Sequence, residues 1–393
     1  MPILLKRLLS IILSQIFIYS FFTEWSISIL DNIPINYFLE IIVFIFLFLP
    51  LFALKSIKQK IINFEFKINN VLPFIFFYIF LPIVHFLILI KYEIFNRRIG
   101  TETIALIYGD MNGLDKFIMR IYDFSQFPFI IIAFLTLKFV KTFKYRTLFK
   151  LVFYLNFLYI TIFALFNSRA SLVVLFIMLF IIDGLFNLIT KKQKKIFIIL
   201  GMFFFITASA IRYIPQVVIF GTDFKDIAKN EFLYRTNCSK FFNEVYEATN
   251  YKGLLYGETI TTPFLSLKAI FGSEVAKEKI RYAETGSKQY ILSNFLHKDN
   301  KDDCSCAVVD SYVNFGFLGI ILLSFIYLFW IFIIYKLVHM NNMKTYHLTL
   351  IILLTSSIML YEIDGFSLLF SFVKFIPIVF IYYILNPISL KRV

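Results

Sequence analysis

Long apolar windows alternate with short polar segments along almost the whole chain. A bilayer core of about 30 Å is crossed by about 20 mostly apolar helical residues. Ten windows approach that length, and we expect each to be a membrane-spanning helix: 4–24, 35–54, 71–90, 121–140, 147–166, 170–190, 196–212, 310–335, 346–361 and 366–386. The pattern predicts an all-α, polytopic integral membrane protein with about ten transmembrane helices.

Basic residues are distributed unequally between the two sides of this arrangement. One side carries 19 of them with a single acid, Glu65: Lys6, Arg7, Lys55, Lys58, Lys60, Lys67, Lys138, Lys141, Lys144, Arg146, Lys150, Lys191, Lys192, Lys194, Lys195, Lys336, Lys344, Lys391 and Arg392. The short loops opposite carry Lys91, Arg97, Arg98, Lys116, Arg120 and Arg169. Cytoplasmic loops are enriched in Lys and Arg, so we expect both termini in the cytoplasm. The first span has no small-residue cleavage site and is interpreted as retained.

One polar segment is far longer than the others. Residues 213–309 lie on the outer side and contain twelve basic and twelve acidic residues without a Pro, Gly or Ser linker run. We therefore expect a folded helical cap rather than a disordered tail. Three regions follow: helices one to seven in 1–212, a periplasmic cap in 213–309, and helices eight to ten with the C-terminus in 310–393.

Composition supports a membrane protein and excludes several other classes. The chain has 393 residues, 60% hydrophobic and 16% charged, with mean hydropathy +0.80. The net charge of +14 comes from the basic cytoplasmic loops, so it does not indicate nucleic-acid binding. The sequence has no Gly-rich phosphate loop, GxSxG elbow, HExxH or paired CxxC motif. We therefore expect no cofactor and no cytoplasmic nucleotide chemistry.

All three cysteines fall in the outer segment. Cys304 and Cys306 are too close to pair comfortably with each other, so a disulfide from Cys238 to either one is the plausible bridge. A zinc site would need four ligands, and His297 completes only an irregular set. No metal site is expected.

Several outward-facing arginines are candidates for anion binding. Arg169 lies in the tight Asn-Ser-Arg-Ala-Ser turn of 167–171, Arg212 closes the seventh span, and Arg235 begins an amphipathic spacing that continues through Phe241, Phe242 and Val245. Interfacial anchoring of these side chains is the alternative, and the amphipathic segment suits a helix on the membrane surface. A guanidinium fixed there can bind a phosphate. Arg281 lies among glutamates and fits a solvated salt-bridge face as well as a ligand contact.

The segment that returns to the membrane carries a second group of candidates. It reads Asp310-Ser311-Tyr312-Val313-Asn314-Phe315-Gly316-Phe317-Leu318-Gly319. Asp310 can cap the eighth helix or accept a proton from a sugar hydroxyl. Gly316 and Gly319 allow a close approach to a neighbouring helix.

The other intramembrane ionisable residues are interpreted mainly as structural. Lys374 can reach Glu362 and Asp364, a pair that could also hold a divalent ion. His85 is expected to be a satisfied core residue, and Asp183 to face Lys191 or Lys192. Secondary transporters typically have an internal repeat with matched interrupted helices, and this chain shows no such repeat.

Together these features resemble the O-antigen polymerase (Wzy-type) family of oligosaccharide repeat unit polymerases. The resemblance rests on the span pattern, the late outer loop, Arg169 after a serine between two central spans, the Tyr234-Arg235 segment, and Asp310-x-Tyr312-x-Asn314-Phe315-Gly316-x-x-Gly319. The family usually has Glu where this chain has Asp310. A Pro-Arg pair of the family is here Pro263-Phe264, and the His-Asn pair of the related O-antigen ligases does not occur.

The resemblance implies a GT-C-like architecture and a glycosyltransferase of the bacterial inner membrane. Such enzymes transfer a glycan from undecaprenyl diphosphate to another lipid-linked repeat unit at the periplasmic face, with no ATP or nucleotide sugar. Catalytic roles would fall to Asp310, Arg169 and Arg235, and substrate contacts to Arg169, Arg212, Arg235, Arg281, Tyr312 and Asn314. The partners would be the lipid-linked oligosaccharide, inner-membrane lipid and a chain-length regulator protein, with no nucleic acid. A ligase, or a flippase or transporter of the same lipid, is the alternative.

Overall fold

The computed structural model describes residues 3–31, 64–94, 110–166, 169–186, 189–221, 223–229, 237–261, 291–297, 307–359 and 367–392. Its long helices are α1 (Ile3–Ile16), α2 (Thr23–Asp31), α4 (Leu72–Lys91), α7 (Gly113–Phe139), α8 (Arg146–Phe166), α9 (Arg169–Phe186), α10 (Lys191–Phe220), α12 (Cys238–Lys252), α16 (Ala307–Val338), α17 (Thr345–Met359) and α18 (Ser367–Leu385). The π-helical turn η1 (Phe17–Phe22) joins α1 to α2. Shorter pieces are α11 (Phe224–Lys229), η4 (Glu258–Thr261) and η5 (Ile291–Phe295).

Every expected span coincides with a helix except 35–54, which lies outside the described residues. Four described helices are long and apolar enough to cross a membrane: α4, α7, α8 and α16. The outward surfaces of the bundle are apolar, as lipid-facing helices require, and include Phe76, Phe80, Leu151, Leu155, Ile198, Phe203, Phe325 and Phe329. The fold is mostly helical and compatible with a polytopic membrane protein.

A small sheet departs from the expected all-α class. Strands β1 (Phe64–Ile68), β2 (Asn342–Lys344) and β3 (Ile388–Arg392) form an antiparallel sheet in the order β1–β3–β2. Phe66 of β1 stacks on Phe139 at the end of α7, with ring centroids 4.4 Å apart. The charge pattern places all three strand segments on the side that we expect to be cytoplasmic. In the structure they lie together at one end of the bundle. We call this the sheet end.

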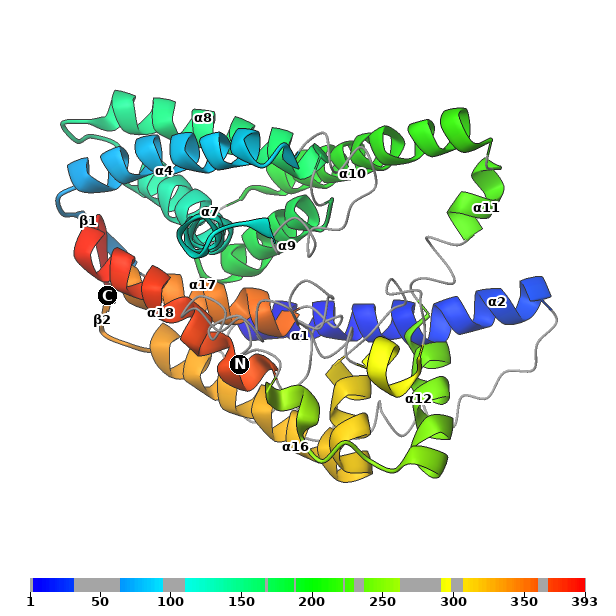
Figure 1. The fold of residues 1–393 in the computed structure, drawn as a ribbon. Coiled ribbons are helices and arrows are strands. Elements are labelled where there is room, and N and C mark those ends of the chain that lie inside the picture. The colour runs from blue at the N-terminus through cyan, green and yellow to red at the C-terminus, as the bar shows by residue number, and fades with distance from the viewer. Residues whose placement is uncertain are drawn as a thin grey trace.

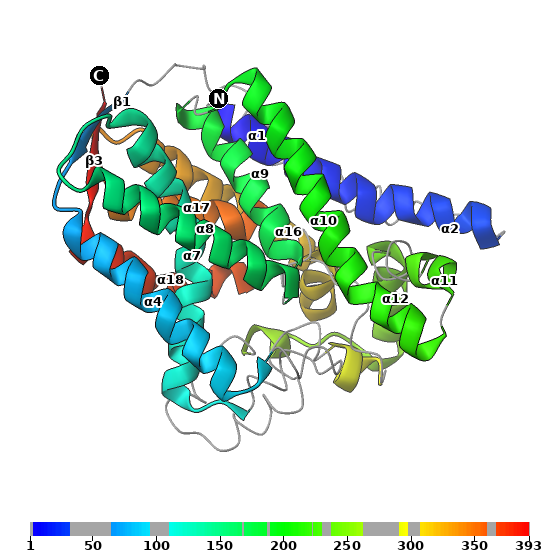
Figure 2. The ribbon, with the colours of Figure 1, turned by 90° about the horizontal axis from the view of Figure 1, so that it is seen from above.

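The opposite end of the bundle carries the described parts of the expected cap. In Figure 2 both chain termini lie toward the sheet, whereas α11 and α12 lie at the far end. Figure 1 shows α4, α7 and α8 grouped together and α12 beside the start of α16. We call the region formed by residues 237–261 and 307–319 the cap end. Most described residues of the cap lie in helices, and residues 253–257 form a loop.

Two helix boundaries differ from the expected spans. Helix α7 begins at Gly113, eight residues before the expected start, because Asn112 caps it by accepting from the backbone N–H of Asp115 (2.7 Å). Helix α10 continues to Phe220 and ends at Gly221 in a left-handed conformation, so Arg212 lies inside a helix rather than at its end. Both helices therefore extend farther from the sheet end than hydropathy indicates.

Candidate functional site

The helix that returns from the cap is interrupted near its start. Within α16, Phe315 (φ −137°, ψ 15°) and Gly316 (φ 61°, ψ −146°) leave the helical conformation. The positive φ at Gly316 is a conformation that a residue with a Cβ adopts only with strain. A Cβ at Gly319 would overlap the carbonyl oxygen of Ser311. Gly319 therefore serves a close approach to Ser311 within this segment, across the break, rather than to a neighbouring helix, whereas Gly316 supplies the positive φ of the break.

A loop from the cap satisfies backbone groups that the break leaves without helical partners. Leu255 donates its backbone N–H to the carbonyl of Val313 (2.9 Å), and Tyr256 donates to the carbonyl of Asn314 (3.0 Å). The N–H of Gly257 donates to Oδ1 of Asn314 (3.0 Å). Buried backbone groups need such partners. The cap loop and the broken helix therefore form one unit.

Asp310 lies at the centre of a buried polar network. Thr259 donates from Oγ1 to Oδ1 of Asp310 (2.6 Å), and Nδ2 of Asn314 contacts both Thr259 Oγ1 (2.5 Å) and the carbonyl of Asp310 (2.7 Å). Nδ2 also lies 3.4 Å from Oδ1 of Asp310. Asp310 is 1% exposed and Asn314 is fully buried. The carboxylate is thus held in one orientation by a hydroxyl and an amide.

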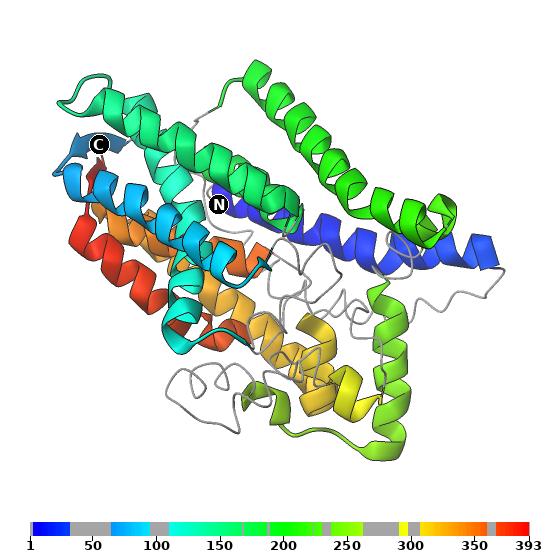
Figure 3. The same cartoon turned by 45° about the horizontal axis from the view of Figure 1, so that its top comes forward.

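Tyr312 connects this network to α12. Its ring lies 5.1 Å from that of Phe242 and 5.7 Å from that of Tyr246, both on α12, and 5.3 Å from that of Phe317 beyond the break. Figure 3 shows α12 beside the first turns of α16. The apolar face of α12, with Phe241, Phe242 and Val245 buried, packs on protein. The expectation that it lies on the membrane surface is therefore wrong.

A disulfide adds a covalent connection at the same place. Cys238, the first residue of α12, is disulfide-bonded. The only other cysteines of the chain are Cys304 and Cys306, so the bridge joins the start of α12 to a residue within three positions of the start of α16. The predicted bridge from Cys238 is confirmed, and its partner lies outside the described residues.

The predicted arginines can be placed only by their backbone. Helix α9 begins at Arg169, and Arg212 lies in α10; the side chains of both, and all of Arg235 and Arg281, lie outside the described residues. Gly201 of α10 packs against the ring of Phe176 of α9. At about 1.5 Å per residue, Arg169 and Arg212 lie about 10 Å and 16 Å from that contact toward the cap end. The two backbones therefore reach a similar depth on adjacent helices.

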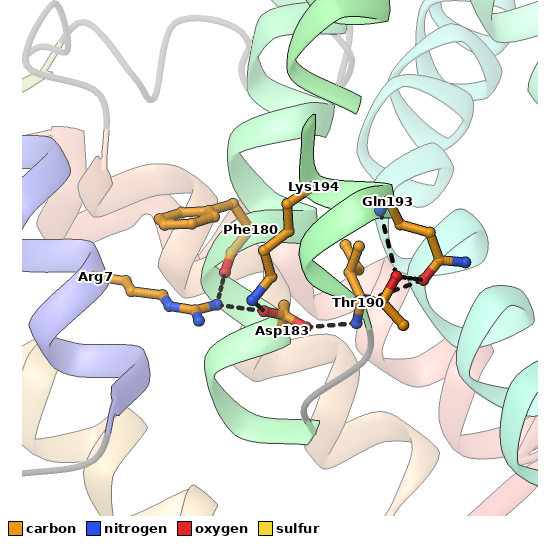
Figure 4. Close-up of polar contacts among 7 residues, drawn as sticks. Arg7, Phe180, Asp183, Thr190, Gln193 and Lys194 are labelled. Atoms are coloured by element: carbon orange, nitrogen blue, oxygen red, sulfur yellow. Dashed lines mark hydrogen bonds and ion pairs between the residues drawn. The ribbon is translucent and has the colours of Figure 1, made fainter. Parts of the chain in front are cut away.

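Asp183 marks the sheet end of α9 and has partners other than those expected. Its Oδ2 accepts from Arg7 (2.7 Å) and pairs with Lys194 (2.8 Å), and its Oδ1 accepts from the N–H of Ile189 (2.7 Å). Figure 4 shows Arg7 and Lys194 converging on this carboxylate from α1 and α10, beside the capping pair Thr190 and Gln193. Lys194, rather than Lys191 or Lys192, is the described lysine partner.

The remaining predicted positions are described only in part. Nδ1 of His85 lies 2.7 Å from the Tyr159 hydroxyl, but its Nε2 is buried without a hydrogen-bond partner among the described residues, so the histidine is half satisfied. The Lys374 side chain, Glu362 and Asp364 lie outside the described residues. In the part of the chain that the structure covers, no three His, Cys, Asp or Glu residues gather as metal ligands.

The sequence interpretation missed two features of this region. Thr259 was not singled out, because a lone threonine in a polar loop carries no signal of its contact with Asp310. Lys116 and Arg120 were assigned to a short loop but lie within α7. The signal that could have found them is the capping pattern of Asn112 and Asp115.

Comparisons with known proteins leave this chain without a relative: no family, no curated protein and no solved structure matches it.

Proposed function

We propose that this protein is an O-antigen polymerase, a glycosyltransferase that joins undecaprenyl-diphosphate-linked repeat units at the periplasmic face of the inner membrane during lipopolysaccharide synthesis. The observation that carries the proposal is the arrangement of the Asp310 to Gly319 motif. Its polar residues and both glycines take part in one broken helix held under the cap loop. A carboxylate fixed at the outer edge of a bundle is suited to act on a sugar hydroxyl.

The proposed reaction needs no external energy source. The acceptor hydroxyl oxygen bonds to the anomeric carbon of the donor glycan, and the bond from that carbon to the diphosphate oxygen breaks. Undecaprenyl diphosphate leaves with the electron pair, and the hydroxyl proton passes to a base. Arg169, Arg235 and Arg212 would stabilise the charge that develops on the diphosphate. Arg281, Tyr312 and Asn314 complete the proposed substrate contacts.

For Asp310 the described contacts support a positioning role. The side chain is enclosed and held through Thr259, so it can orient the loop that receives the acceptor. Direct action as the base is the second assignment and requires the acceptor hydroxyl to reach the carboxylate. In either role the proton-accepting step is worth about 10²- to 10⁴-fold in rate.

The proposal includes a complete topology. It has ten spans in a GT-C-like arrangement, both termini in the cytoplasm and the cap in the periplasm. The basic loops support the placement of the termini, and the sheet supports it too, because its three strands come from segments on the side expected to be cytoplasmic. The substrate is a lipid-linked oligosaccharide, and a chain-length regulator is the proposed protein partner.

One observation favours a second candidate function. Interrupted helices often form the substrate sites of transporters, and α16 is interrupted at Gly316. A flippase of the same lipid-linked oligosaccharide is therefore the alternative. The break lies near the outer start of α16 rather than at its middle, which favours the polymerase. A ligase that transfers the finished chain to another acceptor is a further alternative.

Two experiments test these candidates. Deletion of the gene should leave lipopolysaccharide with a single repeat and no ladder, whereas loss of even the single repeat indicates a step before polymerisation. Purified protein in detergent, given lipid-linked repeats, should lengthen them, because no membrane has to be crossed. The protein is not a polymerase if it fails to lengthen the glycan in detergent and if deletion of the gene leaves the ladder unchanged.

Arg169→Ala and Arg235→Ala should each abolish long chains, because the leaving diphosphate loses a charged donor. Lipopolysaccharide electrophoresis gives the chain length, and membrane fractionation shows whether each variant still inserts. Lys192→Ala, an exposed cation at the sheet end of α10, is the matched control and should keep the ladder. Full ladders in both arginine variants would overturn the diphosphate assignment.

A further inference from the structure

Two strongly exposed tyrosines flank one loop at the cap end. Tyr251, in the last turn of α12, is 91% exposed, and Tyr256, in the loop that follows, is 78% exposed. No other large hydrophobic side chain among the described residues is as exposed as either, including those on the apolar outward faces of the bundle. The cap loop therefore presents two aromatic rings to whatever binds beside it.

The turn that carries Tyr256 does not favour a tyrosine. The backbone N–H of Glu258 donates to the carbonyl of Leu255 (3.1 Å), so residues 255–258 form a β-turn. Both central residues have positive φ, 46° at Tyr256 and 96° at Gly257. Such turns favour Asn, Asp and Gly, because most residues with a Cβ are strained at positive φ. A strained residue of this kind indicates a functional role for its side chain.

Hydrogen bonds to the broken helix hold this turn in place. Three successive backbone N–H groups, those of residues 255–257, donate to Val313 or Asn314 of α16. The amide of Asn314 in turn donates to the carbonyl of Asp310 (2.7 Å). The backbone of Tyr256 is therefore fixed next to the polar network of Asp310, and the exposure of its ring is a built-in property of the fold.

A sugar ring suits both side chains and their position. One face of a pyranose ring carries C–H groups, which the negative face of an aromatic ring attracts, and the tyrosine hydroxyl can hydrogen-bond to a sugar hydroxyl. Tyr251 and Tyr256 are five residues apart, so their Cα atoms lie at most about 18 Å from each other, within the span of a short oligosaccharide. Four of the 15 residues of α12 are charged, which places this helix and the loop after it at the aqueous surface rather than in hydrocarbon. A lipid chain is therefore the less suitable ligand.

We propose that Tyr251 and Tyr256 form an aromatic platform that stacks on sugar rings of the acceptor oligosaccharide. This inference rests on the proposed function, because the glycan is the lipid-linked repeat unit of that reaction. The fixed turn holds one sugar ring beside the loop that contacts Asp310 through Thr259, and Tyr251 supports a second ring along the glycan. The platform makes and breaks no bond, so it acts on the affinity for the acceptor rather than on the chemical step.

Saturation-transfer NMR with the purified full-length protein in detergent tests the platform. The probe is the free oligosaccharide repeat, released from its lipid diphosphate by mild acid. Tyr256→Asn removes the ring and suits the positive φ, so this variant should melt at or above the wild-type temperature yet bind the oligosaccharide about tenfold more weakly. Tyr256→Phe keeps the ring and should keep most of the affinity, whereas Tyr251→Ala should weaken binding several-fold. Tyr383→Ala, which removes an exposed ring from α18, is the matched control and should bind as the wild type does.

Wild-type affinity in both Tyr256→Asn and Tyr251→Ala would overturn the inference, as would a wild-type protein that binds no oligosaccharide. Tyrosines that only anchor the cap at the membrane surface would give this result. If Tyr256→Asn elutes as an aggregate, Tyr251→Ala decides.

The polymerisation assay separates this inference from the proposed function. Tyr256→Asn should raise the KM for the acceptor about tenfold and leave kcat near the wild-type value, because only binding is lost. Ring-dependent binding without glycan growth leaves the platform standing and removes the polymerase. Glycan growth with an unchanged KM in both variants removes the platform alone.

Discussion

Asp183 at the sheet end and Asp310 at the cap end are both buried carboxylates, and their described partners differ in kind. At the sheet end, Asp183 is contacted by the cations Arg7 and Lys194 from two other helices. At the cap end, the described donors to Asp310 are the hydroxyl of Thr259 and the amide of Asn314. An ion pair between helices fixes their relative position, whereas the described hydroxyl and amide donors orient the carboxylate of Asp310. The comparison therefore predicts a structural role for Asp183 and, under the proposed function, a positioning role for Asp310.

Removing the charge from each carboxylate gives the largest contrast. Asp183→Asn leaves two partly buried cations without their counter-charge, so we expect a loss of about 3 kcal/mol in stability. Asp310→Asn keeps an oxygen that accepts from Thr259, so its melting temperature should stay close to wild type while glycan growth falls at least about 100-fold. Thermal unfolding in detergent and the polymerisation assay measure the two effects. Equal thermal losses in both variants would erase the distinction between the ends.

Adding one methyl group at a glycine compares the packing at the cap end with the packing between α9 and α10. A Cβ at Gly319 meets a backbone carbonyl that cannot move independently, so Gly319→Ala should cost about 3 kcal/mol and disrupt the cap loop. Gly201→Ala is the matched control, because its Cβ would lie 3.3 Å from the Phe176 ring, which can shift. Thermal unfolding and limited proteolysis of the cap should separate the two variants. A Gly319→Ala protein as stable as Gly201→Ala would contradict the close approach.

The disulfide is present only at the cap end, so a reductant should act on that end alone. Cys238→Ser should lower stability by about 2 kcal/mol, because the bridge restrains the unfolded cap. Wild-type protein treated with reductant should unfold at the same temperature as Cys238→Ser, and the variant should not respond to the reductant. Asp183→Asn provides the control. The reductant should lower its melting temperature by as much as it lowers that of the wild type.

The smallest expected effect concerns the single hydroxyl that orients Asp310. Thr259→Val removes the donor and should cost about 1 kcal/mol together with several-fold lower glycan growth. Thr259→Ser retains the hydroxyl and should recover most of the activity. Thermal unfolding and the polymerisation assay measure both variants. If valine and serine are indistinguishable in rate, the hydrogen bond to Asp310 has no part in the reaction.

The positions of the helices could be predicted from the sequence, but their ends and contacts could not. Apolar windows such as 71–90 and 366–386 correspond to α4 and α18 within a few residues, because burial in lipid requires long apolar runs. The start of α7 was missed because charges such as Lys116 appear to end a span. The break at Gly316 was missed because hydropathy predicts one continuous helix where the chain changes from polar to apolar residues.

The other features that could not be predicted depend on contacts between segments that are distant in the sequence. The alternation in Phe64-Glu65-Phe66-Lys67-Ile68 is typical of a strand, but its pairing with residues 388–392 cannot be inferred from a local pattern. The Asp310 motif was identified from its residues, while its dependence on Thr259 requires the fold. The roles of the arginines stay predictions, because their side chains lie outside the described residues.

The sheet also has a consequence for how the protein is made. Its central strand pairs Phe64 with Arg392 and Ile68 with Ile388, so β1 cannot find its partner until roughly 320 more residues have been synthesised. At a synthesis rate of about 20 residues per second, β1 waits on the order of 15 seconds. During that time its hydrogen-bonding edge is unpaired at the membrane surface. Closure of the sheet therefore comes long after β1 is made, and it brings together segments that are about 320 residues apart in the chain.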